Sequence, residues 1–276
     1  MVQVILLAVV GFAGGVFGAM VGLGGGVFII PALSLFLDVP IHNAIAASLV
    51  GVVATSTTGS ISYLRQGLAN VRLGMTMETG LTLGALTGGM VGTVLGREVL
   101  SGIFGGVMVM VAVYMGISRR TSPPEPAEDV ALGRLGGVYY DAGLGREVRY
   151  RVRRLPLGVV TALVAGNVSG LLGVGGGFLT VPVMRMGMGI PMRAAVSTSS
   201  FMLGVTACTG AVVYFVRGLV DPVVTVPVVL GVVAGAFLGS RLAVKVRSSV
   251  LAVALAVVLF VLSLQMILAA AGIDLR

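Results

Sequence analysis

Long apolar stretches follow one another along the chain, and short connections between them hold most of the charged residues. A helix that crosses the hydrocarbon core of a bilayer needs about 20 predominantly apolar residues. One segment, 73–96, is interrupted by Glu78 alone, and uncharged runs of about that length or more lie at 1–37, 43–64, 99–118, 155–184, 194–216, 222–240 and 248–273. These runs lack the apolar–polar alternation of a membrane barrel. The pattern predicts an all-α polytopic membrane protein with about 8–10 membrane segments in all.

The two halves of the chain match at one constant offset of 151 positions. The sequence GLGGG at 22–26 falls on GVGGG at 173–177, and the match continues without a gap through Pro31 on Pro182 and a later pair of tyrosines. Internal repeats of this kind are typical of secondary transporters, whose substrate site lies at the repeat interface. The sequence therefore predicts two tandem membrane repeats, 1–118 and 155–276.

The segment 119–154 between the repeats differs sharply in composition. It begins with the proline-rich, charged sequence RRTSPPEPAED, and its later part, GVYYDAGLGREVRYRV, predicts two short strands around an Ala-Gly-Leu-Gly turn. Eight arginines in this segment place it in the cytoplasm by the positive-inside rule. We expect a solvated cytoplasmic linker with a small hairpin; a regulatory or partner-docking role is the alternative.

The distribution of basic residues favours repeats of opposite orientation. If each glycine region crosses the membrane once, 12 basic residues lie inside and 6 outside; if each enters, breaks and returns to the same side, the numbers are 15 and 3. The second arrangement gives each repeat about three full spans plus a glycine-broken helix hairpin. A full crossing stays open as an alternative, because 26–37 covers only about 18 Å as a helix while 2–21 could span.

The glycine runs are the first candidate for a binding site. Irregular backbone at membrane depth is tolerated only where protein buries it or where it lines a wet cavity. The following runs, VFIIPAL and FLTVPVM, predict short helices that begin at the glycines, and helix N-termini favour anions. The alternative is close helix packing through small residues, which suits Gly80, Gly84 and Gly88 better. The predicted backbone donors are Gly24, Gly25, Gly26, Gly175, Gly176 and Gly177.

Polar side chains are predicted to complete the substrate site, although Ser and Thr hydroxyls in membrane helices also bond to carbonyls one turn back. The candidates are Ser48, Asn167, Thr198 and Ser199, the last two within the polar run 197–200; 55–58 is a second polar stretch. Glu78, the one acid within a predicted span, is a candidate for proton coupling. An interfacial or loop-bonded acid is the favoured alternative. Tyr63 and Tyr214, near span ends, suit an aromatic belt.

Composition narrows the function further. The chain is 57% hydrophobic and 10% charged, and its net charge of +8 is concentrated in the connections, as membrane orientation requires, which argues against a nucleic-acid partner. One Cys and one His give no metal cluster, and neither a catalytic constellation nor a P-loop motif is present. We expect no enzyme activity and no cofactor.

The doubled pattern of G-x-GGG, an apolar run, Pro and then Ala-x-x-x-Ser resembles the sulfite exporter TauE/SafE family, as does the hairpin sequence GVYYDAGLGREVRY. The resemblance covers about 5–270. It implies transport of a small sulfur-containing anion (sulfite, thiosulfate, sulfoacetate or another organosulfonate) across a bacterial or archaeal plasma membrane. Where family members commonly have Ala-Thr-Ser-Leu, this chain has Ala46-Ala47-Ser48-Leu49, so the first-half threonine hydroxyl is absent.

We therefore expect a multi-pass secondary transporter that works by alternating access between its two repeats. A channel-like or scaffold membrane subunit, with glycines used for packing alone, is the alternative. The sequence does not specify the exact anion, the direction of transport, the coupling ion or the oligomeric state.

Overall fold

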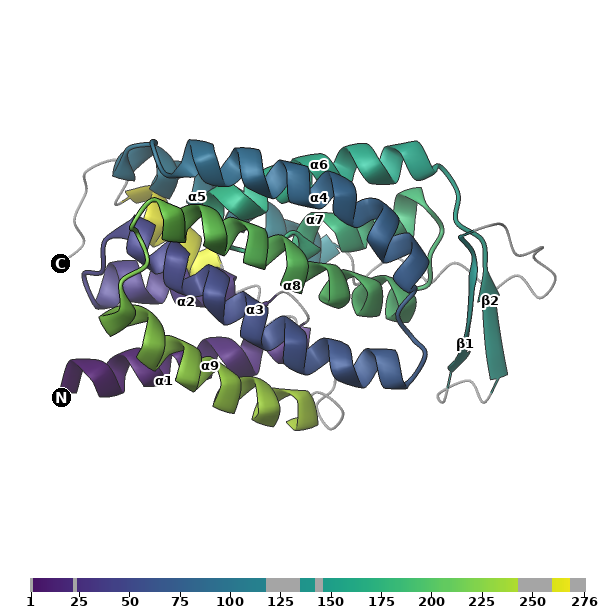
Figure 1. Cartoon of the computed structure of the whole chain (residues 1–276), viewed down its shortest axis with the longest axis horizontal. Coiled ribbons are helices and arrows are strands. Elements are labelled where there is room, and N and C mark those ends of the chain that lie inside the picture. Colours follow the sequence, from purple (N-terminus) through teal and green to yellow (C-terminus); the bar gives the residue numbers. More distant parts are fainter. Residues whose placement is uncertain (1, 22–23, 118–134, 142–145, 243–259, 269–276) are drawn as a thin grey trace.

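The computed structural model describes residues 2–21, 24–117, 135–141, 146–242 and 260–268, and these residues are mostly helical, as predicted (Figure 1). Gly22, the proline-rich start of the linker, the Ala-Gly-Leu-Gly turn and most of 248–273 lie outside the described residues. The elements before the linker are α1 (Val2–Val21), α2 (Gly26–Pro31), η1 (Ala32–Phe36), α3 (Ile41–Arg65), α4 (Val71–Gly92) and α5 (Arg97–Ile117). Those that follow are β1 (Gly137–Asp141), β2 (Arg146–Tyr150), α6 (Leu155–Leu172), α7 (Gly177–Pro182), η3 (Val183–Gly187), α8 (Met192–Val216) and α9 (Pro222–Leu242).

Within the described residues, 5 helices are long and apolar enough to cross a membrane. They lie at Val2–Met20, Ile41–Arg65, Leu155–Leu172, Met192–Val216 and Pro222–Arg241. Helix α4 has 22 residues as well, but it carries Arg72 and Glu78. The polytopic helical fold is therefore confirmed, and the larger number of 8–10 segments stays a prediction.

Glycines join the outer helices into two close pairs, α1 with α9 and α4 with α6. A methyl group at Gly84 or Gly88 would strike the backbone of Leu163 or Asn167 in α6, so the two helices approach until backbone meets backbone. Glycines of α9 lie in the same way against carbonyls of α1: Gly231, Gly235 and Gly239. The packing role expected for Gly80, Gly84 and Gly88 is confirmed.

The central pair, α3 and α8, runs antiparallel. Gly210 lies against Leu49, whereas Gly204 lies against Ser56, so residue numbers rise along one helix as they fall along the other. The α4–α6 pair is parallel, because its contacts advance together from Gly84 and Leu163 to Gly88 and Asn167. In Figure 1 the central pair lies between the two close pairs.

The segment after each glycine run is a short helix that widens into a π-helical turn, α2–η1 and α7–η3. Pro31 and Pro182 end the regular part, because proline lacks an N–H group and its ring crowds the carbonyl of the preceding turn. In the second copy, the Arg153 N–H donates to the Met188 carbonyl at 3.1 Å. The end of η3 therefore lies beside the start of α6.

The strands β1 and β2 form the predicted hairpin, with Gly137 opposite Tyr150. Tyr139, Val148 and Tyr150 are buried in one cluster with residues at the end of the helical bundle, Leu73 and Met188 among them. Burial raises the pKa of the Tyr150 hydroxyl above its usual range. The hairpin is thus docked on the bundle rather than fully solvated.

Candidate functional site

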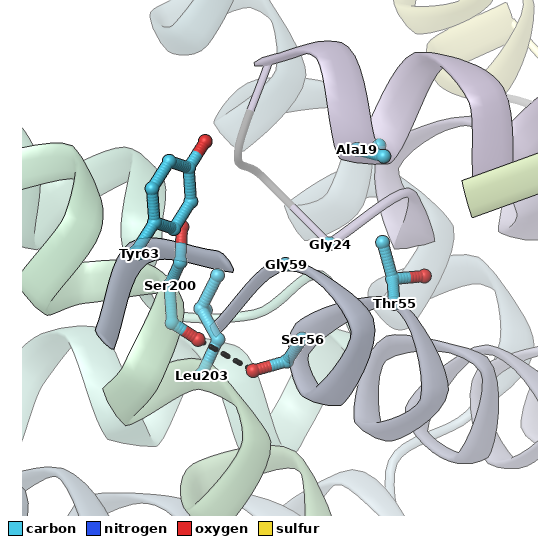
Figure 2. Close-up of a pocket in the computed structure, with 9 residues that line it drawn as sticks. Ala19, Gly24, Thr55, Ser56, Gly59, Tyr63, Ser200 and Leu203 are labelled. Carbon is cyan, nitrogen blue, oxygen red and sulfur yellow. Dashed lines mark hydrogen bonds between the residues drawn. The ribbon is translucent and has the colours of Figure 1, made fainter. Parts of the chain in front are cut away.

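We call the glycine runs at 22–26 and 173–177 the first and second glycine breaks. A small pocket lies between the first glycine break, α3 and α8 (Figure 2). Its lining residues are Gly18, Ala19, Gly24, Thr55, Ser56, Gly59, Tyr63, Ser200 and Leu203. No charged side chain is among them, and four of them carry hydroxyl groups. The pocket is therefore uncharged and mostly apolar, with a few hydroxyl groups, and its free space is about that of one or two water molecules.

Left-handed backbone explains why glycine stands at the first break. Gly24 and Gly25 have φ angles of 81° and 82°, a region that side chains other than glycine rarely adopt. The Gly25 carbonyl accepts from the N–H groups of Phe28 and Ile29 at 3.0 and 3.2 Å. These bonds start α2, so the prediction of a short helix that begins at the glycines is confirmed.

The second break, before α7, repeats this geometry in part: Gly175 matches Gly24, whereas Gly176, the counterpart of Gly25, has a φ of −73°. Gly175 has a φ of 83°, and the Gly176 carbonyl accepts from the N–H groups of Leu179 and Thr180 at 3.3 and 3.1 Å. Gly177 is the first residue of the helix and is buried. The predicted glycines thus begin a buried helix in both copies.

The two breaks meet through Ser48. Its hydroxyl donates to the Gly173 carbonyl at 2.9 Å, and a methyl group at Gly26 would strike both that carbonyl and the Ser48 oxygen. Ser48, Gly26 and the second break therefore form one buried junction. The single hydrogen of this hydroxyl is committed to Gly173 in this conformation.

Ser199 holds the corresponding place in α8. Its hydroxyl lies 3.0 Å from that of Thr180, which in turn bonds to the Gly176 carbonyl at 3.1 Å. All three residues are buried. This chain of bonds attaches α7 to α8.

Two of the predicted substrate residues have other contacts. The Asn167 amide donates to the Thr87 hydroxyl at 3.0 Å across the α4–α6 pair, and the residue is only half-buried. The Thr198 hydroxyl accepts from the Asn70 N–H at 2.9 Å, at the start of α4. Neither residue lines the pocket.

Glu78 is buried at 6% exposure and bonds to residues of α4 and α8 rather than to a loop, so the loop-bonded alternative is wrong. Its Oε1 atom accepts from the Thr82 and Thr206 hydroxyls at 3.2 and 2.9 Å. The expectation of an aromatic belt is also wrong for Tyr214, which is fully buried and donates to the Leu171 carbonyl at 3.2 Å. Interior hydrogen bonds thus replace the water contacts expected for both residues.

Of the substrate-binding residues that the sequence predicts, Gly24 alone lines this pocket, and the other lining residues, Ser56, Gly59, Tyr63 and Ser200 among them, were not predicted as site residues. A signal was present, because positions 56, 59 and 63 are spaced three and four residues apart and so share one helix face. Within the described part of the chain, no group of three or more His, Cys, Asp or Glu residues could hold a metal ion.

Comparison with known proteins agrees with this membrane architecture. The model of the family described as Sulfite exporter TauE/SafE matches residues 7–266. The chain belongs to this family. Among relatives of this TauE/SafE member, the probable membrane transporter protein YunE of Bacillus subtilis is 29% identical over 224 residues, which are 79% of this chain and 80% of the relative.

Other relatives of this TauE/SafE member come from bacteria and archaea. The probable membrane transporter protein YdhB of Bacillus subtilis is 26% identical over 82% of this chain and 84% of its own length. A probable membrane transporter protein of Methanocaldococcus jannaschii is 24% identical over 76% of this chain and 71% of its own length. No solved structure matches the chain.

Proposed function

We propose that this TauE/SafE member is a secondary transporter that moves a small sulfur-containing anion across the plasma membrane. The observation that carries the proposal is the hydroxyl-lined, uncharged pocket beside the first glycine break. The family description, which names sulfite, supports sulfite, thiosulfate, sulfoacetate or another organosulfonate as the substrate class.

The pocket chemistry suits an oxyanion. Oxygen atoms of a sulfur oxyanion accept hydrogen bonds, and the pocket offers the Tyr63 and Ser200 hydroxyls as donors, whereas Thr55 and Ser56 already donate to the carbonyls of Gly51 and Ser200. The Ser200 hydroxyl is buried and has no hydrogen-bond partner in the described protein. A substrate oxygen would provide the acceptor that this group lacks.

The free space of the pocket is small in the conformation described. A sulfur oxyanion is larger than the one or two water molecules for which the pocket has room, so α1 and the break must move relative to α3 and α8 when substrate enters. Movement of this kind, alternately toward each side of the membrane, is what secondary transport requires.

Two inverted repeats would supply the two gates. Elements α7, η3 and α8 begin and end 151 positions after α2, η1 and α3, respectively. The antiparallel crossing of α3 and α8 is what an inverted pair requires. Both observations support the proposal, as does the return of the second broken hairpin beside its own start.

A pocket-filling substitution tests the function. A methyl group at Gly59 would meet only the Tyr63 ring, at 3.9 Å, so Gly59→Leu fills the pocket without striking backbone. Gly106→Leu is the matched control, because Gly106 is helical, exposed and has nothing within 4 Å of the added carbon.

Counterflow of labelled thiosulfate and sulfite would be measured in proteoliposomes. We expect saturable counterflow in the wild type and in Gly106→Leu, and at least a tenfold loss in Gly59→Leu. Non-saturable flux in the wild type would favour a channel, and absent flux at normal reconstitution would favour a scaffold. Equal counterflow in both variants would refute the pocket as the substrate site.

A further inference from the structure

Glu78 has one carboxylate oxygen with two hydroxyl neighbours and one with none. Thr82, one turn further along α4, and Thr206 of α8 bond to Oε1, while Oε2 is buried without a hydrogen-bond partner. A buried carboxylate that keeps its charge without a counter-charge is costly. This geometry therefore favours the protonated acid in the conformation described.

Among the described residues, no cation is paired with Glu78. Helices α6 and α8 pack against α4. Helix α6 contains no titratable residue, and the charged or titratable residues of α4 and α8 besides Glu78 are Arg72, Arg193, Cys208 and Tyr214. The described hydrogen bonds of the carboxylate go to threonines alone, and no ion pair joins Glu78 to any of these residues.

Thr206 can serve both protonation states. Its hydroxyl has one hydrogen and lies 2.9 Å from Glu78 Oε1 and 3.1 Å from the Met202 carbonyl. When the acid is protonated, it can donate to the Thr206 oxygen while Thr206 donates to Met202. When the acid is ionised, the Thr206 hydrogen can turn to the carboxylate. Rotation of the Thr206 hydroxyl alone thus accommodates the gain or loss of a proton by Glu78.

The acid also lies at a boundary between helix groups. Backbone contacts tie α4 to α6, whereas α8 belongs to the central pair with α3. The Glu78–Thr206 bond therefore joins a close outer pair to the centre. Thr206 is the residue that the 151-position offset places on Thr55, a lining residue of the pocket.

We propose that Glu78 binds and releases one proton in each transport cycle and so couples anion movement to the proton gradient. This inference rests on the proposed transport function. In the described conformation the proton is shielded between α4 and α8. When α4 and α6 move away from α8, the carboxyl group meets water and exchanges its proton.

The test compares two activities of the purified protein in proteoliposomes. Thiosulfate is the probe, because its own charge does not change near neutral pH. Anion–anion counterflow needs no net proton movement, whereas accumulation driven by an imposed pH difference does. Glu78→Gln imitates the protonated acid, and Glu98→Gln, at an exposed acid in the first turn of α5, is the matched control.

We expect Glu78→Gln to keep counterflow within about threefold of wild type and to lose at least tenfold in pH-driven accumulation, while Glu98→Gln keeps both. Wild-type accumulation by Glu78→Gln would overturn the inference and leave the transport function intact. Loss of counterflow as well, in a monodisperse protein, would also overturn it. If the wild type lacks counterflow, the proposed function itself fails.

A second pair of variants does not depend on the folding of Glu78→Gln. Thr206→Val removes the hydroxyl that stabilises the carboxylate, and Thr206→Ser retains it. We expect the pH of half-maximal accumulation to shift upward by about one unit in Thr206→Val and to stay in place in Thr206→Ser. An unshifted pH profile in Thr206→Val would overturn the role of Glu78.

Discussion

The Ser48 hydroxyl donates to the Gly173 carbonyl across 125 residues of sequence, at a distance of 2.9 Å. This bond joins α3, in the first half of the chain, to the glycine break of the second half. Because both groups are buried, the bond has no competing water, and the junction of the two breaks depends on it.

Ser48→Ala is expected to lower stability by about 1–2 kcal/mol, because it leaves the Gly173 carbonyl without this donor in the interior. The measurement is the midpoint of thermal unfolding in detergent, followed by size-exclusion chromatography, with counterflow as the second readout. Thr57→Ala is the control, since its hydroxyl bonds only to a carbonyl of its own helix at an exposed position. Equal midpoints for both variants would contradict the junction.

Gly26→Ala is expected to be more damaging than Ser48→Ala. The added carbon would lie 2.6 Å from the Ser48 oxygen and would also strike the Gly173 carbonyl, so the two breaks must separate. Yield of monodisperse protein and counterflow would both fall severalfold. Gly106→Ala, which has open space around the added carbon, should behave as wild type; a similar loss there would assign the effect to helix flexibility instead.

Asn70 allows helix capping and hairpin docking to be separated. Its Oδ1 atom accepts from the Leu73 N–H at 3.1 Å, and its Nδ2 group donates to the Leu135 carbonyl and the Tyr150 hydroxyl. Asn70→Asp keeps the cap and removes the donor to the Leu135 carbonyl, while the Tyr150 hydroxyl can turn to donate to the new carboxylate; Asn70→Ala removes the cap and both docking bonds.

Limited proteolysis of the linker is expected to accelerate in both Asn70 variants, and Asn70→Ala should lose about 1 kcal/mol more in stability than Asn70→Asp. Unchanged cleavage in Asn70→Asp would show that apolar burial alone holds the hairpin. In that case the cluster around Tyr139 and Val148 would carry the docking.

Docking of the hairpin should weaken at alkaline pH. Burial raises the pKa of Tyr150 in the folded protein above the ordinary value of 10.0. The undocked hairpin therefore ionises first, and the stabilisation, complete below pH 10, is lost as the pH rises through the higher pKa of the folded state. Proteolysis of the linker between pH 8 and 11 should accelerate in the wild type. In Tyr150→Phe this acceleration should be smaller, and an identical pH profile would assign it to other groups.

The contacts between connections divide them into two groups, which we expect to lie on opposite sides of the membrane. The bond between Asn70 and Tyr150 places the α3–α4 connection beside the hairpin, and the Arg153–Met188 bond places the end of η3 there too. The His42 ring bonds to the Leu95 carbonyl, which places the start of α3 beside the α4–α5 connection.

In a Cys208→Ser background, cysteines at Gln66 and Met186 should be protected from an impermeant maleimide in intact cells. Cysteines at Gly96 and Arg217 should be labelled. The free Cys208 is exposed on α8 and must be removed first. Labelling of all four positions from one side would refute the proposed orientation.

Sequence reasoning was sufficient for the features that local chemistry determines. Apolar length indicated the membrane helices, the glycine–proline pattern indicated α2 and α7, and the strands of the hairpin followed from alternation and turn residues. The spacing of Gly80, Gly84 and Gly88 indicated a packing face. Each of these signals lies within one element.

Relations between distant elements could not be predicted in the same way. Ser48 and Ser199 were assigned to substrate, but each hydroxyl bonds to the opposite break or to α7, and that choice depends on how helices cross. Glu78 is close to Arg72 in sequence and yet faces Thr206 of α8. Tyr214 has the spacing of a span-end residue, and its burial results from the nearby end of α6.

The close pairs also have a consequence for biogenesis. Helix α4 finds its backbone partner only when α6 has been synthesised, and α1 waits roughly 200 residues for α9. During translation, the faces of α1 and α4 that later pack against α9 and α6 are exposed to lipid. The ribosome therefore releases a chain in which α1 and α9, far apart in sequence, must find each other, and a truncation before α9 would leave α1 without its partner.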